Sequence, residues 1–340
     1  MPSAPLADLL EQLDPARPET LAATDARGLL WRNRDTVETY RERVRRILDE
    51  GEKLLPKLAD GAELKLFDTF PVTAADAIPA EIMNEAAQTT WGLYRFAINW
   101  VPGFFLRRGM GALWGGCAAI DPETFFTVFL VRHSFANSPH WFLYDRKELL
   151  AHELCHVARM TLDDPAYEEH FAYATAQSRL RRYMGNWFQT KWDAILFLLP
   201  VLILLAAESL RTFGPVHYPI WPFWLLALTY PGFLLVRNQR QRQTFFQAFL
   251  ALRTAGCGYP AAVLFRCDAA EIAELARQRK QTPDVLLGGL RQKAQSSLKW
   301  QVIVYRFIDH PETMEMDIPS ATEKPSGAEY DEIDSGNGLS

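Results

Sequence analysis

Cysteine is scarce in this chain of 340 residues, and no two cysteines form a C-x-x-C pair. Because their spacing shows no regular framework, we expect no disulfide scaffold, and a reducing compartment is the simplest setting. The N-terminus also lacks the uninterrupted apolar stretch of a signal peptide, so we expect no cleaved export signal. The four cysteines are Cys117, Cys155, Cys257 and Cys267.

A strong net positive charge is lacking, and the basic residues cluster near the apolar segments. The net charge is −5, and residues 309–340 contribute −8, with nine acidic residues against Lys324. The rest of the chain is therefore only slightly basic, at +3. No face is basic enough for nucleic acid, so that class of partner is excluded. Residues 309–340, which also contain Pro, Ser and Gly, are predicted to form a disordered acidic tail.

Hydrophobic residues, by contrast, are abundant. They make up 49% of the chain and include ten Trp and twenty-one Phe, which indicates contact with a bilayer. Residues 194–207 and 218–236, of fourteen and nineteen residues, contain no charged side chain. A helix needs roughly twenty apolar residues to cross a bilayer. We therefore predict a transmembrane helical hairpin over residues 191–237, with a hairpin buried in a soluble core as the alternative.

Basic residues flank this hairpin on both outer sides, whereas the loop between its helices holds only Arg211. Lys and Arg favour the cytoplasmic side of a membrane. The hairpin is therefore expected in the cell inner membrane, with the regions before and after it in the cytoplasm. The flanking residues are Arg179, Arg181, Arg182, Lys191, Arg237, Arg240 and Arg242.

Periodicity and turn signals predict the other elements. Residues 1–28 are expected to be loosely structured, and residues 33–55 show the helical spacing of a surface amphipathic helix. A second helix is expected over residues 80–100, where a V-P-G run ends it, and residues 124–131 are typical of a strand. The apolar run at residues 302–308 also resembles a strand. Helix starts are predicted at Asp268, which has capping-box spacing to Glu271, and at Thr282-Pro283.

One helix carries the chemistry. Asp145 and Glu148 have the spacing of a reciprocal helix cap, and the periodic run continues to about Met160. Within it lies an H-E-x-x-H motif, in which His152 and His156 are four residues apart and share one helix face. Neutral imidazoles in this arrangement suit zinc. Glu153, between them, is the expected general base for a water that attacks a peptide carbonyl.

A catalytic zinc needs a third protein ligand. The metzincin pattern is excluded, because Arg159 and Leu162 occupy the positions of its Gly and third His. Carboxylates follow on a second predicted helix, which begins near Pro165 and continues through Tyr173. The candidates are Glu169, which begins an E-x-x-A sequence, its neighbour Glu168, Asp164 at the start of D-x-x-Y, and His170.

The two motifs together resemble those of gluzincin peptidases, in particular the E-x-x-A-D of membrane-bound members such as the prenyl-protein proteases. That resemblance implies Glu169 as the third ligand, although Tyr173 stands where the motif has Asp. A D-x-x-Y ligand at Asp164 would instead resemble an aspzincin site. The order of motifs over residues 90–310 is also similar to that of uncharacterised bacterial membrane proteins with a predicted metallopeptidase domain.

Other side chains are weaker candidates. Tyr173, Tyr167 or His170 could stabilise a developing oxyanion, although packing is the more common role of such residues. The strand at residues 124–131 could pair with an extended substrate, but a place within the core sheet is the stronger expectation. Cys155 faces away from the histidines on its helix and is expected to be a small buried hydrophobe.

These features predict an α+β fold, with a mainly helical zincin-like domain, a small sheet and a transmembrane hairpin. The expected function is zinc-dependent hydrolysis of peptide or protein substrates at a membrane, with Zn²⁺ as the cofactor. The alternatives are a zinc-binding membrane regulator without protease activity and a membrane scaffold with incidental histidines. The expected regions are 1–59 (N-terminal, helical), 60–190 (metallopeptidase), 191–237 (hairpin), 238–308 (cytoplasmic, helical) and 309–340 (tail).

Overall fold

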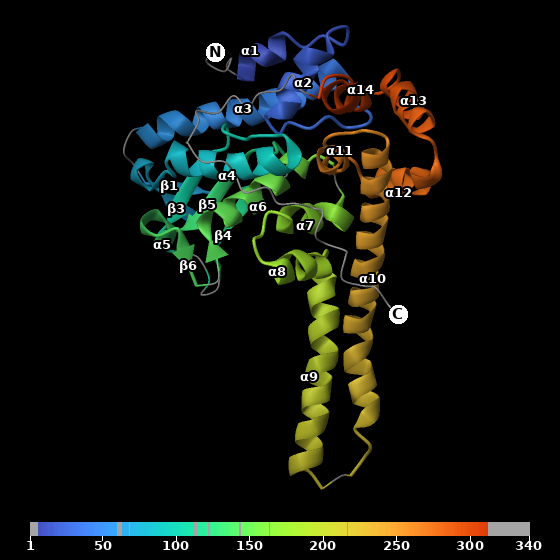
Figure 1. The fold of residues 1–340 in the computed structure, drawn as a ribbon. Helices are drawn as coiled ribbons and strands as arrows, with labels where there is room; N and C mark the ends of the chain where they lie inside the picture. Colours follow the sequence, from blue (N-terminus) through green and yellow to red (C-terminus); the bar gives the residue numbers. More distant parts are fainter. Residues whose placement is uncertain are drawn as a thin grey trace.

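A long pair of helices projects from the rest of the molecule, where the other described helices and the small sheets gather (Figure 1). This computed structural model describes residues 6–59, 63–67, 69–109, 111, 114–121, 123–142, 144–162, 164–215 and 217–311. Helices predominate over strands, in agreement with the predicted α+β class. The predicted acidic tail lies outside the described residues from position 312 onward.

The N-terminal region is more ordered than expected. The expectation of loose structure over residues 1–28 is wrong for its described part, which contains two helices. Leu10 and Leu21 are buried there against Val44 of the predicted amphipathic helix, so tertiary contacts stabilise short helices with weak local signals. The helices are α1 (Leu6–Glu11), α2 (Pro18–Ala26) and α3 (Val37–Ala59).

A mixed three-stranded sheet, in the order β3-β5-β4, forms the centre of the middle region. Strand β5 pairs in parallel with β3 and antiparallel with β4, so β4 is an edge strand. The predicted strand at residues 124–131 is β5, which is central and therefore cannot pair with a substrate. The strands are β3 (Gly103–Leu106), β4 (Gly116–Ile120) and β5 (Thr127–Arg132), with two-stranded ladders β1 (Leu64–Leu66) to β2 (Phe70–Val72) and β6 (His140–Trp141) to β7 (Tyr144–Asp145).

The two faces of this sheet are covered by different elements. Phe105 and Phe129 belong to the main core, together with residues of α4 (Ala80–Tyr94) and α6 (Arg146–Arg159). Phe104 and Leu130, which alternate with them along the strands, pack instead with Leu54 of α3 and with the β1–β2 ladder. The period-two alternation of the strands thus places α6, with its H-E-x-x-H motif, on one defined face.

Helix α4 ends six residues before the predicted boundary. Arg95 adopts a left-handed conformation, with φ of 58°, and its N–H donates to the carbonyl of Trp91. A left-handed residue ends a helix in this way because it turns the chain out of the helical path. The V-P-G run follows in the segment that enters β3. The short elements around α4 and after β5 are η1 (Ala74–Asp76) and α5 (Ser134–Asn137).

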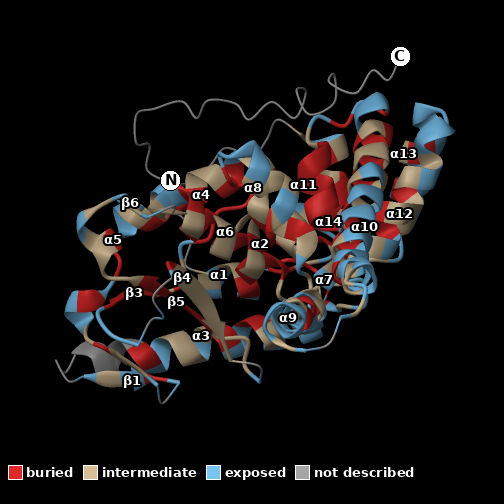
Figure 2. Cartoon of the chain, turned by 90° about the horizontal axis from the view of Figure 1, so that it is seen from below, coloured by how far each residue is buried: buried red, intermediate tan, exposed pale blue. Residues whose placement is uncertain are grey.

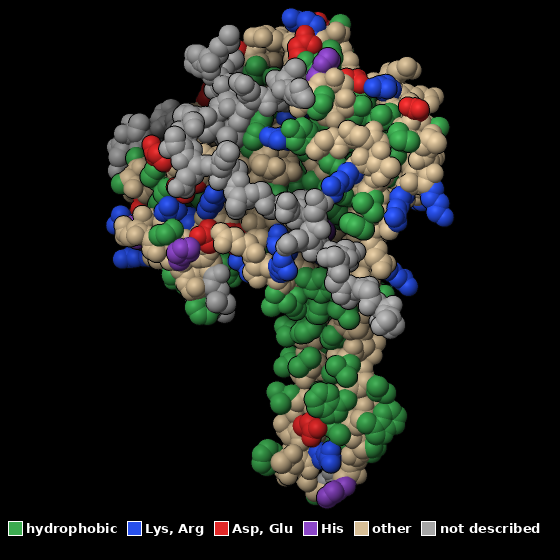
Figure 3. Space-filling view, in the orientation of Figure 1, with side chains coloured by type: hydrophobic (Ala, Val, Ile, Leu, Met, Phe, Trp, Pro, Cys, Tyr) green, Lys and Arg blue, Asp and Glu red, His purple; other side chains and the backbone are tan. Residues whose placement is uncertain are grey.

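The predicted hairpin consists of α9 (Lys191–Phe213) and α10 (Trp221–Thr254), which pack side by side (Figure 1). Asp193, near the start of α9, links the two helices, because it accepts hydrogen bonds from two residues of α10. These are Tyr230, through Oη at 2.6 Å, and Arg237 at 3.1 Å. Asp193 also accepts from the N–H of Thr190 at 2.9 Å and so caps α9. Figure 2 views α9 nearly end-on and shows its surface mostly exposed, while Figure 3 shows hydrophobic side chains covering the projecting pair.

Among the described residues, one helix is long and apolar enough to cross a membrane, namely α9 over Trp192–Phe213. Helix α10 does not meet the same criterion. Its apolar part covers only residues 221–236 and contains Trp, Tyr and Pro, and the polar remainder continues into the body. A crossing by both helices therefore stays a prediction.

The region after the hairpin is helical throughout its described length. The prediction of a strand over residues 302–308 is wrong. These residues form the end of α14 and a π-helical turn. Its β-branched residues are buried within helical packing, and such packing overrides local strand preference. The predicted helix starts at Asp268 and Pro283 are confirmed. The helices are α11 (Pro260–Phe265), α12 (Ala269–Arg277), η3 (Gln278–Lys280), α13 (Pro283–Ala294), α14 (Leu298–Val304) and η4 (Tyr305–Asp309).

One hydrophobic core joins this C-terminal region to the middle of the chain. Phe265 of α11 stacks on Tyr94 of α4 with ring centroids 4.3 Å apart, and lies 5.3 Å from the Phe171 ring. A buried Arg266 donates to Asp25 of α2 at 2.8 Å. Helices before and after the hairpin therefore fix one another's positions.

Candidate functional site

Helix α6 begins where the sequence predicted, at Asp145, whose carboxylate accepts from the N–H of Glu148 at 2.9 Å. The reciprocal half of the predicted cap is not formed, because the Glu148 carboxylate contacts the N–H of Gln177 and Arg181. One apolar stripe of α6 is buried, which turns the opposite face with both histidines toward α7 (Pro165–Tyr173). The stripe consists of Leu150, Leu154 and Val157, and Cys155 is buried beside it as expected.

Helix α7 has the predicted bounds. Asp164 caps it by accepting from the N–H of Ala166 at 3.3 Å, and Pro165 occupies its first position. Ala172 is fully buried, as expected of a small residue where α7 packs on α6. The close packing of these two helices brings the carboxylates of α7 to the imidazoles of α6.

Glu169 converges with the two histidines. Nε2 of His152 lies 3.1 Å from Nε2 of His156, and the Glu169 oxygens lie 3.7 Å from the first nitrogen and 3.8 Å from the second. The three potential ligand atoms all lie within 4.8 Å of one another. Ligands at about 2.0–2.1 Å from a tetrahedral zinc are about 3.3–3.4 Å apart. The nitrogen pair lies near that spacing, whereas the two Glu169 distances are longer and belong to different oxygens, Oε2 toward His152 and Oε1 toward His156.

Glu168 and Asp164 have other roles. Glu168 Oε1 lies 3.0 Å from Nδ1 of His156, on the side of the ring away from Glu169. Its second oxygen accepts from Nε of Arg159 at 3.2 Å, and the same guanidinium pairs with Asp164 at 3.0 Å. A carboxylate at the outer nitrogen of a ligating His fixes the ring and its tautomer. Glu168 is thus placed as a support for His156, and Asp164 is occupied by Arg159.

Glu153 reaches the sheet from α6. Its Oε2 accepts from the backbone N–H of Ala118, on edge strand β4, at 2.9 Å. Burial raises the pKa of the Glu153 carboxyl, although the charge of His156 and this hydrogen bond oppose the shift. A raised pKa makes a carboxylate a stronger base, as a general base requires.

The two histidines differ in their affinity for a proton. Burial, and then the charge of His156, lower the pKa of His152 to about 3. Burial also lowers the pKa of His156, but hydrogen bonding to Glu168 and the charges of the surrounding carboxylates outweigh it and raise the pKa to about 9. The cluster therefore attracts one positive charge between its nitrogens and oxygens, which a proton or a metal ion can provide.

Of the three predicted oxyanion candidates, one lies at the cluster. The Tyr173 ring meets the His152 ring edge-on, with centroids 4.6 Å apart. Tyr167 donates from its hydroxyl to the carbonyl of Gln241 at 3.2 Å, and His170 packs on Phe245 of α10. Tyr167 and His170 thus face α10 and contribute to packing.

Two further groups at the site were not predicted from the sequence. Arg159 is fully buried and holds Glu168, and Ala118 supplies only a backbone N–H to Glu153. The one sequence feature that could have indicated the role of Arg159 is an arginine within a helix turn that is otherwise buried. A backbone donor from a strand distant in sequence has no signature in residue type.

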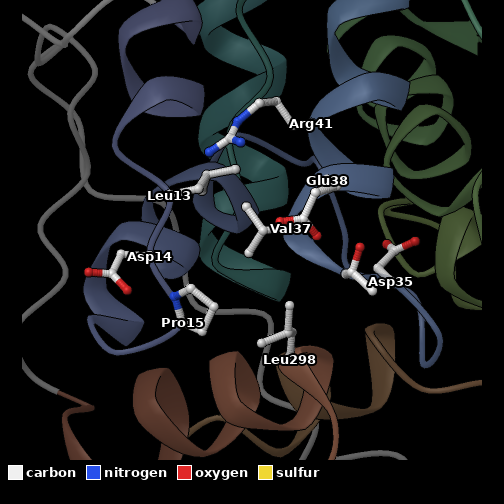
Figure 4. Close-up of a pocket in the computed structure, with 9 residues that line it drawn as sticks. Leu13, Asp14, Pro15, Asp35, Val37, Glu38, Arg41 and Leu298 are labelled. Atoms are coloured by element: carbon white, nitrogen blue, oxygen red, sulfur yellow. The ribbon is translucent and has the colours of Figure 1, made fainter.

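A separate surface pocket of about 380 Å³ lies between α3, the α1–α2 connection and α14 (Figure 4). Its charged residues have partners: Asp14 accepts from the N–H of Ala16 at 2.9 Å, and Arg41 donates to the carbonyl of Leu10 at 3.0 Å. These contacts stabilise the N-terminal helices, and none of the predicted site residues lines the pocket.

No protein-family model matches this chain, and no curated protein or solved structure matches it either. Its function is therefore inferred from the geometry around His152, His156 and Glu169.

Proposed function

We propose that this protein is a membrane-anchored zinc-dependent peptidase, with Zn²⁺ held by His152, His156 and Glu169. The convergence of these three ligand atoms within 4.8 Å supports the metal, and the position of Glu153 beside them supports catalysis. A zinc ion in this set would polarise a peptide carbonyl and lower the pKa of a water. A purely structural zinc site has four protein ligands and needs no adjacent base.

Glu153 performs the proton transfers in this proposal. Its partly buried carboxylate is held by the Ala118 N–H, which leaves the other oxygen to accept the proton of the attacking water. The same carboxyl then returns the proton to the leaving amine. Glu168 and Arg159 hold the His156 ring in position throughout, and Tyr173 borders His152.

Edge strand β4 offers a place for an extended substrate. The carbonyl of Gly115 and the N–H of Asp121 bond to the β5 side, each at 2.9 Å, whereas the N–H of Ala118 points to the free edge. Backbone groups alternate along a strand, so those of Gly116 and Ile120 also face that edge. A peptide that pairs with the backbone of Gly116 or Ile120 would run beside Glu153, which retains the Ala118 N–H.

The hairpin supports a membrane location for this activity. Leu202 of α9 and Leu228 of α10 are more than half exposed, as are several neighbours, and so large an apolar surface is costly in water. We propose that both helices insert in the cell inner membrane and that the body, with the catalytic cluster, lies on the cytoplasmic side. Basic residues at the hairpin base, such as Arg179 and Arg240, favour this orientation.

The direct test uses purified full-length protein in detergent, incubated with a peptide library with and without a chelator. Cleavage that the chelator abolishes and zinc restores is the expected result. Glu153→Gln should retain near-stoichiometric zinc and lose activity. Loss of zinc in this variant would contradict the role of Glu153 as a base. Bound zinc in the wild type without cleavage of any peptide would favour the non-proteolytic zinc-binding regulator.

A further inference from the structure

A large cavity lies at the base of the hairpin, where α10 leaves its apolar part and passes between α8 (Arg179–Met184) and α12. Its volume is about 920 Å³, large enough for a small organic ligand. It is separate from the histidine cluster, since none of His152, His156 and Glu169 lines it. The 3₁₀ turn η2 (Gly185–Trp187) joins α8 to the start of α9 nearby.

The lining of the cavity is both basic and apolar. Arg240 and Arg242 of α10 and Arg277 of α12 line it, and none of the described residues that line it is acidic. Phe245, Phe246 and Phe249 provide an apolar side to the same space. Arginines in a lining without carboxylates suit a phosphate group, because a guanidinium offers paired donors. The adjoining aromatic rings suit an apolar chain.

A buried polar atom of His170 also borders this cavity. Nδ1 of His170 is buried and has no hydrogen-bond partner among the described residues. Its ring packs on Phe245 with centroids 4.5 Å apart, so it is held in place at the cavity wall. Buried polar atoms are almost always paired in folded proteins, so this nitrogen offers a hydrogen-bonding position to a polar group that enters the cavity.

The position along α10 favours a lipid as that partner. Gln239, the first lining residue of α10, comes three residues after Val236, the last residue of the apolar part. A helix rises 1.5 Å per residue, so the backbone positions of Arg240 and Arg242 lie within about 10 Å, along the helix axis, of the end of the apolar part of α10. A phospholipid with its headgroup in the cavity could thus leave its acyl chains along that surface.

We propose that this cavity binds the headgroup of an anionic phospholipid, with the phosphate between Arg240, Arg242 and Arg277 and the glycerol region against the phenylalanines. This site is distinct from the proposed peptidase centre and does not depend on zinc. It also differs from general attraction of basic residues to an anionic membrane, because it requires the half-open cavity as well as charge.

The experiment measures lipid binding to full-length protein in neutral detergent by native mass spectrometry, with phosphatidylglycerol, phosphatidylcholine and inorganic phosphate as separate probes. Phosphatidylglycerol should bind with one-to-one stoichiometry, and phosphatidylcholine should bind at least about tenfold more weakly. Arg240→Gln combined with Arg277→Gln should weaken phosphatidylglycerol binding by about tenfold or more, since charge-assisted hydrogen bonds are lost.

Two variants separate a built site from general attraction. Gln243→Trp, at an exposed lining position, fills the cavity without changing charge and should weaken binding as strongly as the double variant. Arg179→Gln removes an exposed charge near the hairpin base outside the cavity and should leave binding within about twofold of the wild type. Equal effects of all three, or no discrimination between the two lipids, would overturn the proposal. Binding of inorganic phosphate that displaces phosphatidylglycerol at equal concentration would assign the site to free phosphate instead.

His152→Ala tests the independence of this site from the proposed peptidase centre. This variant should lose zinc and retain phosphatidylglycerol binding. Loss of lipid binding in a folded His152→Ala protein would show that the cavity is not a separate site.

Discussion

Glu168 Oε1 lies 3.0 Å from Nδ1 of His156 and thereby contacts the nitrogen that faces away from the rest of the cluster. The next residue of α7, Glu169, approaches Nε2 of the same ring at 3.8 Å. Successive residues of a helix point about 100° apart, so two adjacent carboxylates reach opposite nitrogens of one imidazole. This arrangement gives them different expected roles, one as ligand and one as support.

Substitution of each carboxylate should separate these roles. Glu168→Gln should lower zinc affinity by about 10–100-fold, the usual effect of removing a support of a ligating His. Glu169→Gln should lower it further, because a ligand is lost. Competition with a chromophoric zinc chelator measures both. Glu42→Gln, an exposed change on α3, is the control and should have no effect. A larger loss from Glu168→Gln than from Glu169→Gln would reverse the assignment.

Arg159 is expected to be the most sensitive structural residue near the site. It is fully buried and pairs with Glu168 and Asp164, at 3.2 and 3.0 Å. Arg159→Met should cost about 3–5 kcal/mol, because the buried Asp164 and the partly buried Glu168 would lose their countercharge. Arg46→Met, which breaks an exposed pair with Glu42, should cost at most about 1 kcal/mol. Denaturant unfolding in detergent measures both, and equal losses would contradict this role of Arg159.

Two glycines should respond in opposite ways to alanine. A Cβ at Gly185 would lie 2.0 Å from Cγ of Tyr173, so Gly185→Ala should push this ring away from His152. We expect a loss of about 1–3 kcal/mol from overpacking, together with reduced peptidase activity. Gly92, within α4, has no atom within 4 Å of the position that a Cβ would take, and Gly92→Ala should stabilise the protein by about 0.5–1 kcal/mol. Thermal unfolding measures the two effects, and a stable, fully active Gly185→Ala protein would contradict the contact.

The membrane topology can be tested by single cysteine labels. Thr212 is exposed near the end of α9, and Ser296 is exposed between α13 and α14. In right-side-out membrane vesicles, an impermeant maleimide should label Thr212→Cys directly and Ser296→Cys only after permeabilisation. The wild type, whose cysteines are buried or partly buried, gives the background. Labelling of both positions from the same side would contradict a hairpin that crosses the membrane twice.

The sequence predicted elements best where local chemistry is strong. Asp145 and Asp164 accept backbone N–H groups at the helix starts of α6 and α7, and Pro165 fits the first turn of α7. Such caps act within a few residues, so the sequence is sufficient to locate them. The same holds for Asp268 and Glu271, which form a capping box at α12.

The sequence did not predict the elements whose conformation depends on contacts with residues far away in the chain. Leu10 and Leu21 are ordered by burial against other helices, and the residues 302–308 are helical because they pack within the helical C-terminal region. Neighbouring carboxylates could not be separated either, since both Glu168 and Glu169 lie near the edge of α7 that faces α6. Only the orientation of α7 against α6 distinguishes them.

The most direct test of the central claim is anomalous diffraction at the zinc edge from crystals of the full-length protein, supported by metal analysis. We predict one zinc ion per chain, coordinated by Nε2 of His152, Nε2 of His156 and a carboxylate oxygen of Glu169, with Glu168 at Nδ1 of His156. Zinc-replete crystals without a peak among these residues, or with an ion coordinated elsewhere, would contradict it.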